Sequence, residues 1–368
     1  MQDRKNIALY IPFMIFNPLH HQMDQGGMAK GFNNCGYDVK MVVGRVLGEF
    51  KDDAYKIIET GVTDKHNLRS LMQEFIFIIR FLGSNRPNLT VFWNVGILNP
   101  LVIAWFRLYL VLTGRGRTMS KLALRLDWDG ELRGSKITRI LFLARLNIIS
   151  LFANHVTIET SCGYKKARAL LLLKRKLSII PAGFSKEILY HPKKTASREK
   201  CILSVARVAR YKGVDDLIRA VEIVFKKKTA WRLLIAGMFE DIGYLHELRE
   251  QINRARLNDR ILFLGEVSQE QLASLYVTSA IFCTMPRMES YGLSRAEALV
   301  NGMYVVTTEA GCARDLIGAR VVKIGEFEKA ASSLLELIDL IENNKGNVVP
   351  DTSSILSWDD VAQRFISI

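Results

Sequence analysis

The chain has 368 residues, of which 49% are hydrophobic and 24% charged, so it can bury large cores and its length favours two domains. Its five cysteines are scattered and form no C-x-x-C pair, which argues against a disulfide framework or a zinc site and favours a reducing compartment. The net charge is +14, and residues 1–185 hold 26 Lys and Arg against 13 Asp and Glu, whereas residues 186–368 hold 25 against 24. We therefore expect the first half to meet an anionic partner: nucleic acid, an anionic membrane or a phosphorylated molecule.

No targeting segment or membrane span is expected. The N-terminus leads into a short apolar run at residues 7–11, which predicts a first strand rather than a signal peptide. The most apolar segment, residues 101–112, is interrupted by Arg107 and falls short of the roughly 18 apolar residues that a span requires.

The first half alternates predicted strands and helices. After the strand at residues 7–11, Asp24-Gln-Gly-Gly27 leads into a helix that ends at Asn34. A glycine pair between a strand and a helix lets the backbone approach a phosphate, although such pairs are also common in ordinary turns. Helices over residues 68–82 and 100–112 flank a strand at 89–93, which is a βαβ pattern.

Two apolar and basic segments of this half allow two interpretations. Residues 101–112 are followed by a basic run at 114–121, and residues 137–152 carry Arg139 and Arg145. Each segment fits a patch on a membrane surface, and each also fits a core helix with solvated basic residues beside it.

Two aspartates follow the next predicted strand. Leu124-Arg-Leu-Asp-Trp-Asp-Gly130 places Asp127 and Asp129 at a strand's carboxyl end, where open α/β sheets bind ligands, although ordinary loop aspartates fit equally well. Short strands at residues 157–160 and 178–183 close this half, and the polar residues 186–200 predict a linker.

The second half opens with a strand from Cys201 and then places two cations in a loop. Arg207 and Lys212 precede a predicted helix over residues 214–225, and together they could neutralise a diphosphate. Strands at residues 231–236 and 261–264 and a helix at 269–276 continue a regular alternation that is typical of a doubly wound domain.

The segment from Pro286 to Gly302 has the strongest pattern of a site. A strand at residues 281–285 and a helix at 293–300 leave Glu289 in the loop between them. If the helix begins near Ser290, the free N–H groups at its start favour an anion such as phosphate. These are the amides of Tyr291, Gly292 and Leu293.

Glu297 has two interpretations. With Glu289 it brackets the anion-binding turn, which suits a ligand with hydroxyl groups on both sides of a diphosphate, such as a nucleotide sugar. Ser294 and Glu297 also satisfy the S-x-x-E capping box, in which the glutamate only bonds an amide at the helix start.

Four motifs resemble, in order and spacing, the retaining glycosyltransferases of family 4. They are Ser204-Val-Ala-Arg-x-x-x-x-Lys-Gly213, Phe263-Leu-Gly-Glu-Val267, Pro286-x-x-Glu-Ser-Tyr-Gly-Leu293 with Glu297, and Gly302-Met-Tyr-Val-Val306. Looser likenesses are the glycine pair Gly26-Gly27, the turn Ile180-Pro-Ala-Gly-Phe184 and the terminal Ser357-Trp-Asp-Asp-Val-Ala-Gln-Arg-Phe365. The resemblance implies the GT-B fold, an α/β architecture of two Rossmann-like, doubly wound domains facing a cleft. Residues 1–185 would form the acceptor-side domain, 186–350 the donor domain, and 351–368 a helix that crosses back.

The resemblance also implies roles for individual residues. Arg207 and Lys212 would stabilise the departing diphosphate in place of a metal, so neither a metal nor a cofactor is expected. Glu289 would bind hydroxyls of the transferred sugar, and Glu297 those of the ribose. The backbone from Ser290 to Leu293 would contact sugar and phosphate, together with Gly27 in the first half, and Val267 would meet the base.

The chain departs from the family pattern at three places. Arg287 stands where a serine is frequent, so an extra cation would lie by the donor or face solvent. Cys312 stands where a second glycine is usual. The acceptor-side histidine has no counterpart, and Asp127, at about that place, is the candidate for acceptor contact.

The resemblance implies a cytoplasmic, peripherally membrane-associated enzyme that moves a hexose from a nucleoside diphosphate sugar to a glycan or lipid-linked acceptor with retention. UDP is favoured over GDP, although no side chain distinguishes the bases. The alternatives are a nucleotide-sugar epimerase of the same fold and a non-catalytic nucleotide-sugar-binding or membrane scaffold protein. Nucleic acid is not an expected partner, because the basic half holds no recognised binding module.

Overall fold

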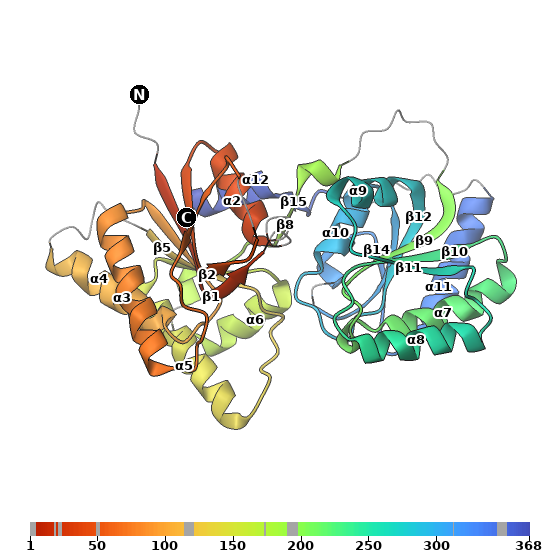
Figure 1. Ribbon diagram of the computed structural model, residues 1–368, viewed down its shortest axis with the longest axis horizontal. Coiled ribbons are helices and arrows are strands. Elements are labelled where there is room, and N and C mark those ends of the chain that lie inside the picture. Colours follow the sequence, from red (N-terminus) through yellow and green to blue (C-terminus); the bar gives the residue numbers. More distant parts are fainter. Residues whose placement is uncertain are drawn as a thin grey trace. The chain divides into compact units, whose positions relative to one another are not determined.

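The computed structural model describes residues 5–17, 20, 24–48, 52–113, 121–172, 174–189, 198–311, 313–343 and 352–368. The chain divides into two compact units: unit 1 holds Met1–Gly183 and Leu356–Ile368, and unit 2 holds Phe184–Ile355. The sequence-based division lay between residues 185 and 186 and assigned 351–368 to the returning helix. Each unit is a sheet flanked by helices (Figure 1), as predicted for a chain of α/β class.

Unit 1 is built on a seven-stranded sheet with the order β3-β2-β1-β4-β5-β6-β7, in which every pair of neighbours is parallel. The chain order reverses between β1 and β4, which makes this sheet doubly wound. Its strands are β1 (Asn6–Phe16), β2 (Asp38–Val46), β3 (Lys56–Glu59), β4 (Leu89–Trp93), β5 (Lys121–Leu126), β6 (His155–Ile158) and β7 (Leu177–Ile179).

Helices cover both faces of this sheet, because parallel strands that are apolar along their length must be buried on both sides. All five residues of β4 are buried, as such a strand requires. The helices of the first part of the chain are α2 (Asp24–Asn34), α3 (Leu68–Asn85), α4 (Asn99–Leu112), α5 (Lys136–Phe152) and α6 (Ser161–Leu170).

The last helix of the chain, α12 (Trp358–Ser367), belongs to unit 1 and packs against α2. A Cβ atom added to Gly27 would lie 2.2 Å from the indole nitrogen of Trp358, and one added to Gly31 would lie 2.3 Å from the Trp358 carbonyl oxygen. The two glycines therefore give the space that α12 occupies. Just before α12, β15 (Leu356–Ser357) pairs with β8 (Gly183–Phe184) in a two-stranded sheet.

Unit 2 contains a six-stranded parallel sheet with the order β11-β10-β9-β12-β13-β14. Here the chain order reverses between β9 and β12, so the second sheet is also doubly wound. Its strands are β9 (Glu199–Val205), β10 (Arg232–Ala236), β11 (Ile261–Gly265), β12 (Ser279–Thr284), β13 (Tyr304–Thr308) and β14 (Ala319–Val322).

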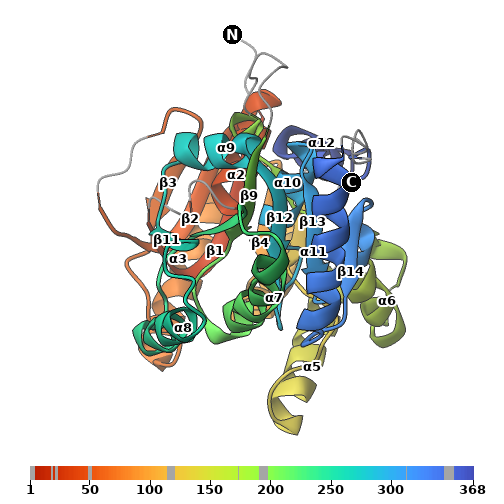
Figure 2. The same ribbon diagram turned by 90° about the vertical axis from the view of Figure 1, so that its right-hand side faces the viewer.

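Two layers of helices enclose this sheet (Figures 1 and 2). Helices α7 (Val214–Lys227), α8 (Ile242–Arg254) and α11 (Phe327–Glu342) pack together in the main core of the unit. Helices α9 (Gln269–Thr278) and α10 (Leu293–Val300) pack against the strands separately from them. All six residues of β12 are buried, so this strand is central to the unit.

Most predicted elements agree with the structure to within a few residues. The predicted helices that end at Asn34 and Val300 are confirmed as α2 and α10, and the strand at 89–93 is confirmed as β4. The pattern analysis did not identify α6, α8 or α11. The basic run at 114–120, the linker residues 190–197 and Cys312 lie outside the described residues. None of the described helices combines the length and apolarity needed to cross a membrane.

Candidate functional site

The switch point of the second sheet brings together the residues predicted to bind a diphosphate and a sugar. Arg207 and Lys212 lie in the loop that follows β9, and Glu289 lies in the loop that follows β12. Strands β9 and β12 are parallel neighbours, and their loops lead to α7 and α10 in different helix layers. Ligands of open α/β sheets bind in the crevice that such diverging loops leave.

The two loops meet in an ion pair. The Lys212 ammonium donates to the Glu289 carboxylate over 2.7 Å, and the two side chains are only 14% and 18% exposed. The next residue, Gly213, has a left-handed backbone, and an added Cβ would lie 1.9 Å from the carbonyl oxygen of Met285. This close approach requires a glycine, and it fixes the spacing between the lysine and the glutamate.

Arg207 is held by a third loop, which follows β10. Its guanidinium lies 2.8 Å from the Glu240 carboxylate, and the Tyr211 hydroxyl donates to the same oxygen over 3.0 Å. The Tyr211 ring centre lies 5.5 Å from both the Arg207 guanidinium carbon and the Lys212 ammonium nitrogen. Burial, helped by the bond to Glu240, raises the pKa of Tyr211 to about 12, so it stays a neutral donor between the two cations. The sequence motifs did not identify Tyr211 or Glu240.

The helix predicted over residues 293–300 is confirmed as α10, but the anion-binding hypothesis assumed an earlier start. The helix begins at Leu293 rather than near Ser290, because Gly292 takes a left-handed conformation with φ of 79° at the cap. The Ser290 amide donates to the side chain of Glu289 over 3.2 Å, and Tyr291 is buried. The amides at the helix start are therefore those of Gly292, Leu293 and Ser294, one residue later than the predicted set.

The capping-box interpretation of Glu297 is wrong. Gly292 occupies the cap, and Glu297 lies in the body of α10, where its carboxylate accepts a hydrogen bond from the Tyr276 hydroxyl over 2.9 Å. Burial raises the pKa of Glu297 to about 7, and the bond from Tyr276 opposes that rise. Glu297 therefore does not cap α10 but bonds the Tyr276 side chain of α9.

Arg287 neither stays free for a donor nor simply faces solvent. Its guanidinium donates to Asp215 over 2.7 and 2.9 Å and to Asp216 over 2.6 Å, at the start of α7. The hydrogen bond with Asp215 raises the pKa of Arg287, so the clamp stays charged. The predicted extra cation therefore ties the loop after β12 to the loop after β9.

Val267 completes the same edge of the sheet. It follows β11 and lies just before α9, which starts with a capping box between Ser268 and Gln271. The loops after β9, β10, β11 and β12 all leave the carboxyl edge of one parallel sheet, so the backbone of Val267 faces the same side as Arg207 and Lys212.

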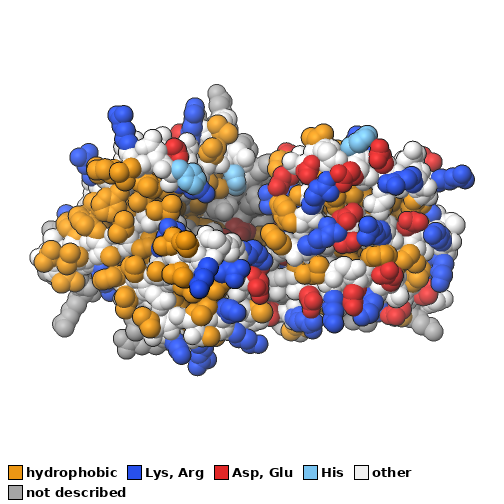
Figure 3. Space-filling view, turned by 90° about the horizontal axis from the view of Figure 1, so that it is seen from below, with side chains coloured by type: hydrophobic (Ala, Val, Ile, Leu, Met, Phe, Trp, Pro, Cys, Tyr) orange, Lys and Arg blue, Asp and Glu red, His pale blue; other side chains and the backbone are white. Residues whose placement is uncertain are grey.

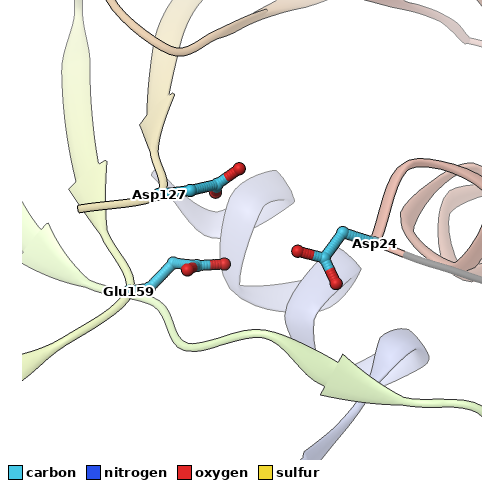
Figure 4. Close-up of side chains that lie close together, drawn as sticks. All are labelled: Asp24, Asp127 and Glu159. Atoms are coloured by element: carbon cyan, nitrogen blue, oxygen red, sulfur yellow. The ribbon is translucent and has the colours of Figure 1, made fainter. Parts of the chain in front are cut away.

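Unit 1 has a second cluster at the corresponding edge of its sheet. Asp127 follows β5, Glu159 follows β6, and Asp24 begins α2. One carboxylate oxygen of each lies within 4.8 Å of the other two, and Figure 4 shows the three groups pointing toward one another. Of these residues the sequence identified only Asp127, because the other two belong to no local motif.

A buried arginine supplies the positive charge beside these carboxylates. Arg125 lies 2.5 Å from Glu159 and 3.4 Å from Asp127, and its guanidinium carbon is 5.1 Å from the ring centre of Trp93 and 5.8 Å from that of Trp358. The Trp93 indole also donates to Asp127 over 2.5 Å. Three oxygen ligands could hold a metal ion, but the guanidinium already occupies the cation's place next to two of them.

Glu159 is the most deeply buried carboxylate of the cluster. Burial raises the pKa of Glu159 well above its usual range, and the neighbouring Asp127 charge adds to the rise, while the Arg125 charge opposes it. Glu159 is only 2% exposed, whereas Asp24 and Asp127 are partly exposed. Asp24 and Asp127 are therefore the carboxylates that a ligand can reach.

Gly27, predicted to contact phosphate, lies inside α2 and is fully covered. The indole of Trp358 lies where its side chain would be, so packing of α12 accounts for a glycine at this position. Such a packing contact has no local sequence signal, because the two residues lie 331 positions apart in the chain.

Comparisons with known proteins bear on the family resemblance and on the fold. The family model of the glycosyl transferases group 1 matches residues 186–352. The chain is 25% identical over 218 residues to the phosphatidylinositol N-acetylglucosaminyltransferase gpi3 subunit of Schizosaccharomyces pombe, covering 57% of this chain and 47% of that protein. It is 32% identical over 113 residues to the lipopolysaccharide core biosynthesis mannosyltransferase LpcC of Rhizobium leguminosarum bv. viciae, covering 30% of this chain and 32% of that protein. The alignments thus span less than half the length of these curated relatives.

The fold extends the likeness over the whole chain. The crystal structure of Anabaena Alr3699/HepE in complex with UDP and glucose superposes with a TM-score of 0.72 at 15% identity, covering 99% of both chains. The family model of the glycosyl transferases group 1 thus covers residues 186–352, and the chain as a whole has the predicted GT-B fold.

Proposed function

We propose that the protein is a retaining glycosyltransferase that moves a hexose from a nucleoside diphosphate sugar to a hydroxyl group of a membrane-associated glycan or glycolipid. The observation that carries the proposal is the pairing of Lys212 with Glu289 at the switch point of the second sheet, beside Arg207 and the start of α10. It supplies cations for a diphosphate and a carboxylate for sugar hydroxyls in one place.

In the proposed reaction, the bond between the sugar's anomeric carbon and the diphosphate oxygen breaks while the acceptor oxygen attacks the same face. Arg207 and Lys212 stabilise the negative charge that develops on the diphosphate, so no metal is required. A phosphate oxygen takes the proton of the acceptor hydroxyl. Donor binding would break the Lys212–Glu289 ion pair and give each partner to a different part of the donor.

The other donor contacts follow from the same edge of the sheet. The amides of Gly292, Leu293 and Ser294 would bind phosphate and sugar, since they lie at the positive end of α10. Glu297 would accept from the ribose hydroxyls, and the backbone of Val267 would meet the base. UDP is favoured over GDP, and the solved neighbour that holds UDP and glucose supports this choice.

Asp127 and Asp24 are the proposed acceptor contacts. Both carboxylates are partly exposed at the carboxyl edge of the first sheet, and Arg125 and Trp93 hold Asp127 in place. Carboxylates accept hydrogen bonds from sugar hydroxyls, so this cluster suits a carbohydrate acceptor.

A membrane-bound acceptor is favoured by the surface of unit 1. Helix α4 exposes an apolar stripe at helical spacing, formed by Leu101, Trp105, Leu108 and Leu112, and α5 exposes Ile137, Ile140, Leu141 and Ile148. Figure 3 shows hydrophobic side chains gathered over unit 1, whereas unit 2 presents a mixture of both charges. Such a face on a basic unit suits peripheral contact with anionic lipid. Two of the similar proteins are a phosphatidylinositol N-acetylglucosaminyltransferase subunit and a lipopolysaccharide core mannosyltransferase, which supports this acceptor class.

A donor panel tests the enzymatic proposal. The purified protein is incubated with labelled UDP, GDP and ADP sugars, and both thermal stabilisation and product are recorded. Slow donor hydrolysis with selective stabilisation supports a transferase. An epimerised donor would instead support the nucleotide-sugar epimerase of the same fold, and a bound but unchanged donor would support the non-catalytic alternative.

Vesicle flotation tests the membrane proposal. The full-length protein should float with phosphatidylcholine vesicles that contain phosphatidylglycerol, and binding should fall as salt rises. The double variant Leu101→Gln/Leu108→Gln should lose binding, whereas Ile242→Gln, an exposed apolar residue of unit 2, should not. Equal binding of wild type and double variant would contradict the assignment of α4.

A further inference from the structure

Two arginines of the chain are among its largest fully buried side chains, and their surroundings differ. Arg125 in unit 1 faces two carboxylates. Arg295 in unit 2 is 1% exposed and donates only to neutral oxygens: the carbonyl of Tyr291 at 2.8 Å, the carbonyl of Ala310 at 3.0 Å and the hydroxyl of Thr307 at 3.5 Å. Within the part of the chain that the structure describes, its charge has no carboxylate partner.

The position of Arg295 places its charge next to a second source of positive potential, the start of α10. It is the third residue of α10, and its guanidinium lies against Gly292 at the cap, where an added Cβ would meet the Arg295 Nε at 2.2 Å. This end of the helix carries a partial positive charge of its own. The Arg295 Nε is buried and donates to no partner. A buried cation, an unused donor and a positive helix end therefore coincide beneath the loop at residues 289–292.

Arg295 also joins two loops. Through Tyr291 it bonds the loop after β12, and through Ala310 it bonds the loop after β13. These loops touch at Gly311, which has a φ of 68° and whose added Cβ would lie 2.1 Å from the Ser290 carbonyl oxygen. The guanidinium thus holds the backbone from Ser290 to Gly292 in its conformation and also makes the electrostatic potential at this loop more positive.

We infer that Arg295 is a positioning residue for the donor: it holds the loop at residues 289–293 in the form that binds the diphosphate, and the diphosphate supplies its missing counter-charge. This inference rests on the proposed function of the same site. It explains why a residue type that is rarely buried unpaired lies at the start of α10. It also predicts that Arg295 acts on the phosphate part of the donor and leaves the nucleoside part unaffected.

The test compares charge-removing and charge-keeping variants with ligands that differ only in phosphate. Affinities of UDP, GDP, inorganic pyrophosphate, uridine and guanosine are measured by calorimetry on the full-length protein, and melting temperatures are recorded without ligand. Arg295→Gln should weaken the nucleoside diphosphate that wild type binds, and pyrophosphate, by about tenfold or more, and should change nucleoside affinity less than twofold. Arg295→Lys keeps the charge and should stay within about threefold of wild type for all ligands.

Arg198 provides a matched control. Like Arg295, it donates to three neutral oxygens, here the backbone carbonyls of Tyr276, Ser279 and Asn301, but it precedes β9 and so lies at the opposite edge of the same sheet. Arg198→Gln should lower the melting temperature without a selective loss of diphosphate affinity. Arg295→Gln should lower the ligand-free melting temperature less, because it also removes an uncompensated buried charge.

Three outcomes would overturn the inference. Equal loss of nucleoside and diphosphate affinity in Arg295→Gln would indicate a purely structural role, and unchanged diphosphate affinity would remove any role in donor binding. If Arg295→Gln and Arg295→Met both fail to fold while Arg295→Lys folds, the charge serves the fold itself. If wild type binds neither pyrophosphate nor any nucleoside diphosphate, the proposed function fails as well, whereas the first three results leave it standing.

Discussion

The carboxyl edge of the first sheet and that of the second are built by the same alternation of strand, loop and helix, yet they hold opposite chemistry. In unit 2, Arg207 and Lys212 line the switch point, and each forms an ion pair with one glutamate. In unit 1, Asp24, Asp127 and Glu159 share one arginine. The first edge therefore favours hydroxyl or cationic groups, and the second favours an anion.

The difference shows that the sheet topology determines where a binding site can form, and that the residues in the loops determine which class of ligand it binds. Both sheets are parallel and doubly wound, so both present loops at a switch point. In each unit a side chain from another part of the chain contacts this edge: Trp358 lies beside Arg125 of β5, and Arg287 donates to Asp215 of α7. The comparison can be tested by removing one charge at a time from each edge.

The largest effect is expected at Lys212. Replacing Lys212 with Met removes a cation from the leaving diphosphate and leaves Glu289 unpaired, so transfer from the donor should fall by about 100-fold or more. The rate is measured with the donor that the panel selects. Lys226→Met, on the exposed surface of α7, is the control and should keep full activity. A loss below threefold in Lys212→Met would contradict the cationic assignment of this edge.

The clamp at Arg287 comes next. Arg287→Met leaves two partly buried aspartates without a partner, so unit 2 should lose about 2 kcal/mol of stability. Differential scanning calorimetry measures the loss, and Arg219→Met, an exposed neighbour that also contacts Asp216, should cost far less. If both variants melt alike, the clamp is not what holds the loop after β12.

On the first edge, Asp127→Asn should impair use of the acceptor without changing donor binding. The amide keeps the shape but loses the charge beside Arg125, so kcat/KM for the acceptor should fall about tenfold while donor affinity stays constant. Asp129→Asn, two residues along the same loop and paired with Arg133, is the control and should show a smaller change. A matching loss of donor affinity in Asp127→Asn would show that the two edges do not divide the substrates as proposed.

The smallest expected effect is a pH dependence at Glu297. Its folded pKa of about 7 lies above that of an unfolded glutamate, near 4.3, so the folded protein holds the proton more tightly. The stability that this group contributes is present below about pH 4.3 and is lost as pH rises through 7. Melting temperatures from pH 5 to 8.5 should therefore fall in wild type relative to Glu297→Gln, whose amide can still accept from Tyr276. Parallel curves would show that burial does not perturb this carboxylate.

Sequence patterns predicted the second edge far better than the first. Arg207, Lys212 and Glu289 stand in loops whose strands and helices have clear apolar periods, so their position at one edge followed from the alternation alone. The apolar period also predicted the bounds of α10, residues 293–300, but the start near Ser290 that the anion argument assumed is wrong, because the left-handed Gly292 precedes the helix. The ion pairs of Arg287 form because its long side chain extends to aspartates about 70 residues earlier in the chain, and no periodic sequence pattern predicts such a contact.

On the first edge the sequence offered only Asp127. Asp24, Arg125 and Glu159 come from separate loops and strands and meet only in the folded sheet, so local spacing could not associate them. Gly27 shows a related limit, because its place after a strand suggested phosphate, whereas no local pattern indicates that Trp358 packs against it. Contacts between residues that are far apart in the sequence thus determine the composition of this edge, and local sequence patterns do not predict them.

The packing of α12 on α2 has a consequence for biosynthesis. Unit 2 is one continuous stretch, Phe184–Ile355, so it can close its core as soon as that stretch has left the ribosome. Unit 1 must wait for Leu356–Ile368, because Trp358 fills the space over Gly27 and lies against Arg125. The acidic edge of unit 1 is therefore completed only after the stretch that forms unit 2 has been made, and a nascent chain that stalls before Leu356 would hold a finished unit 2 and an open core in unit 1.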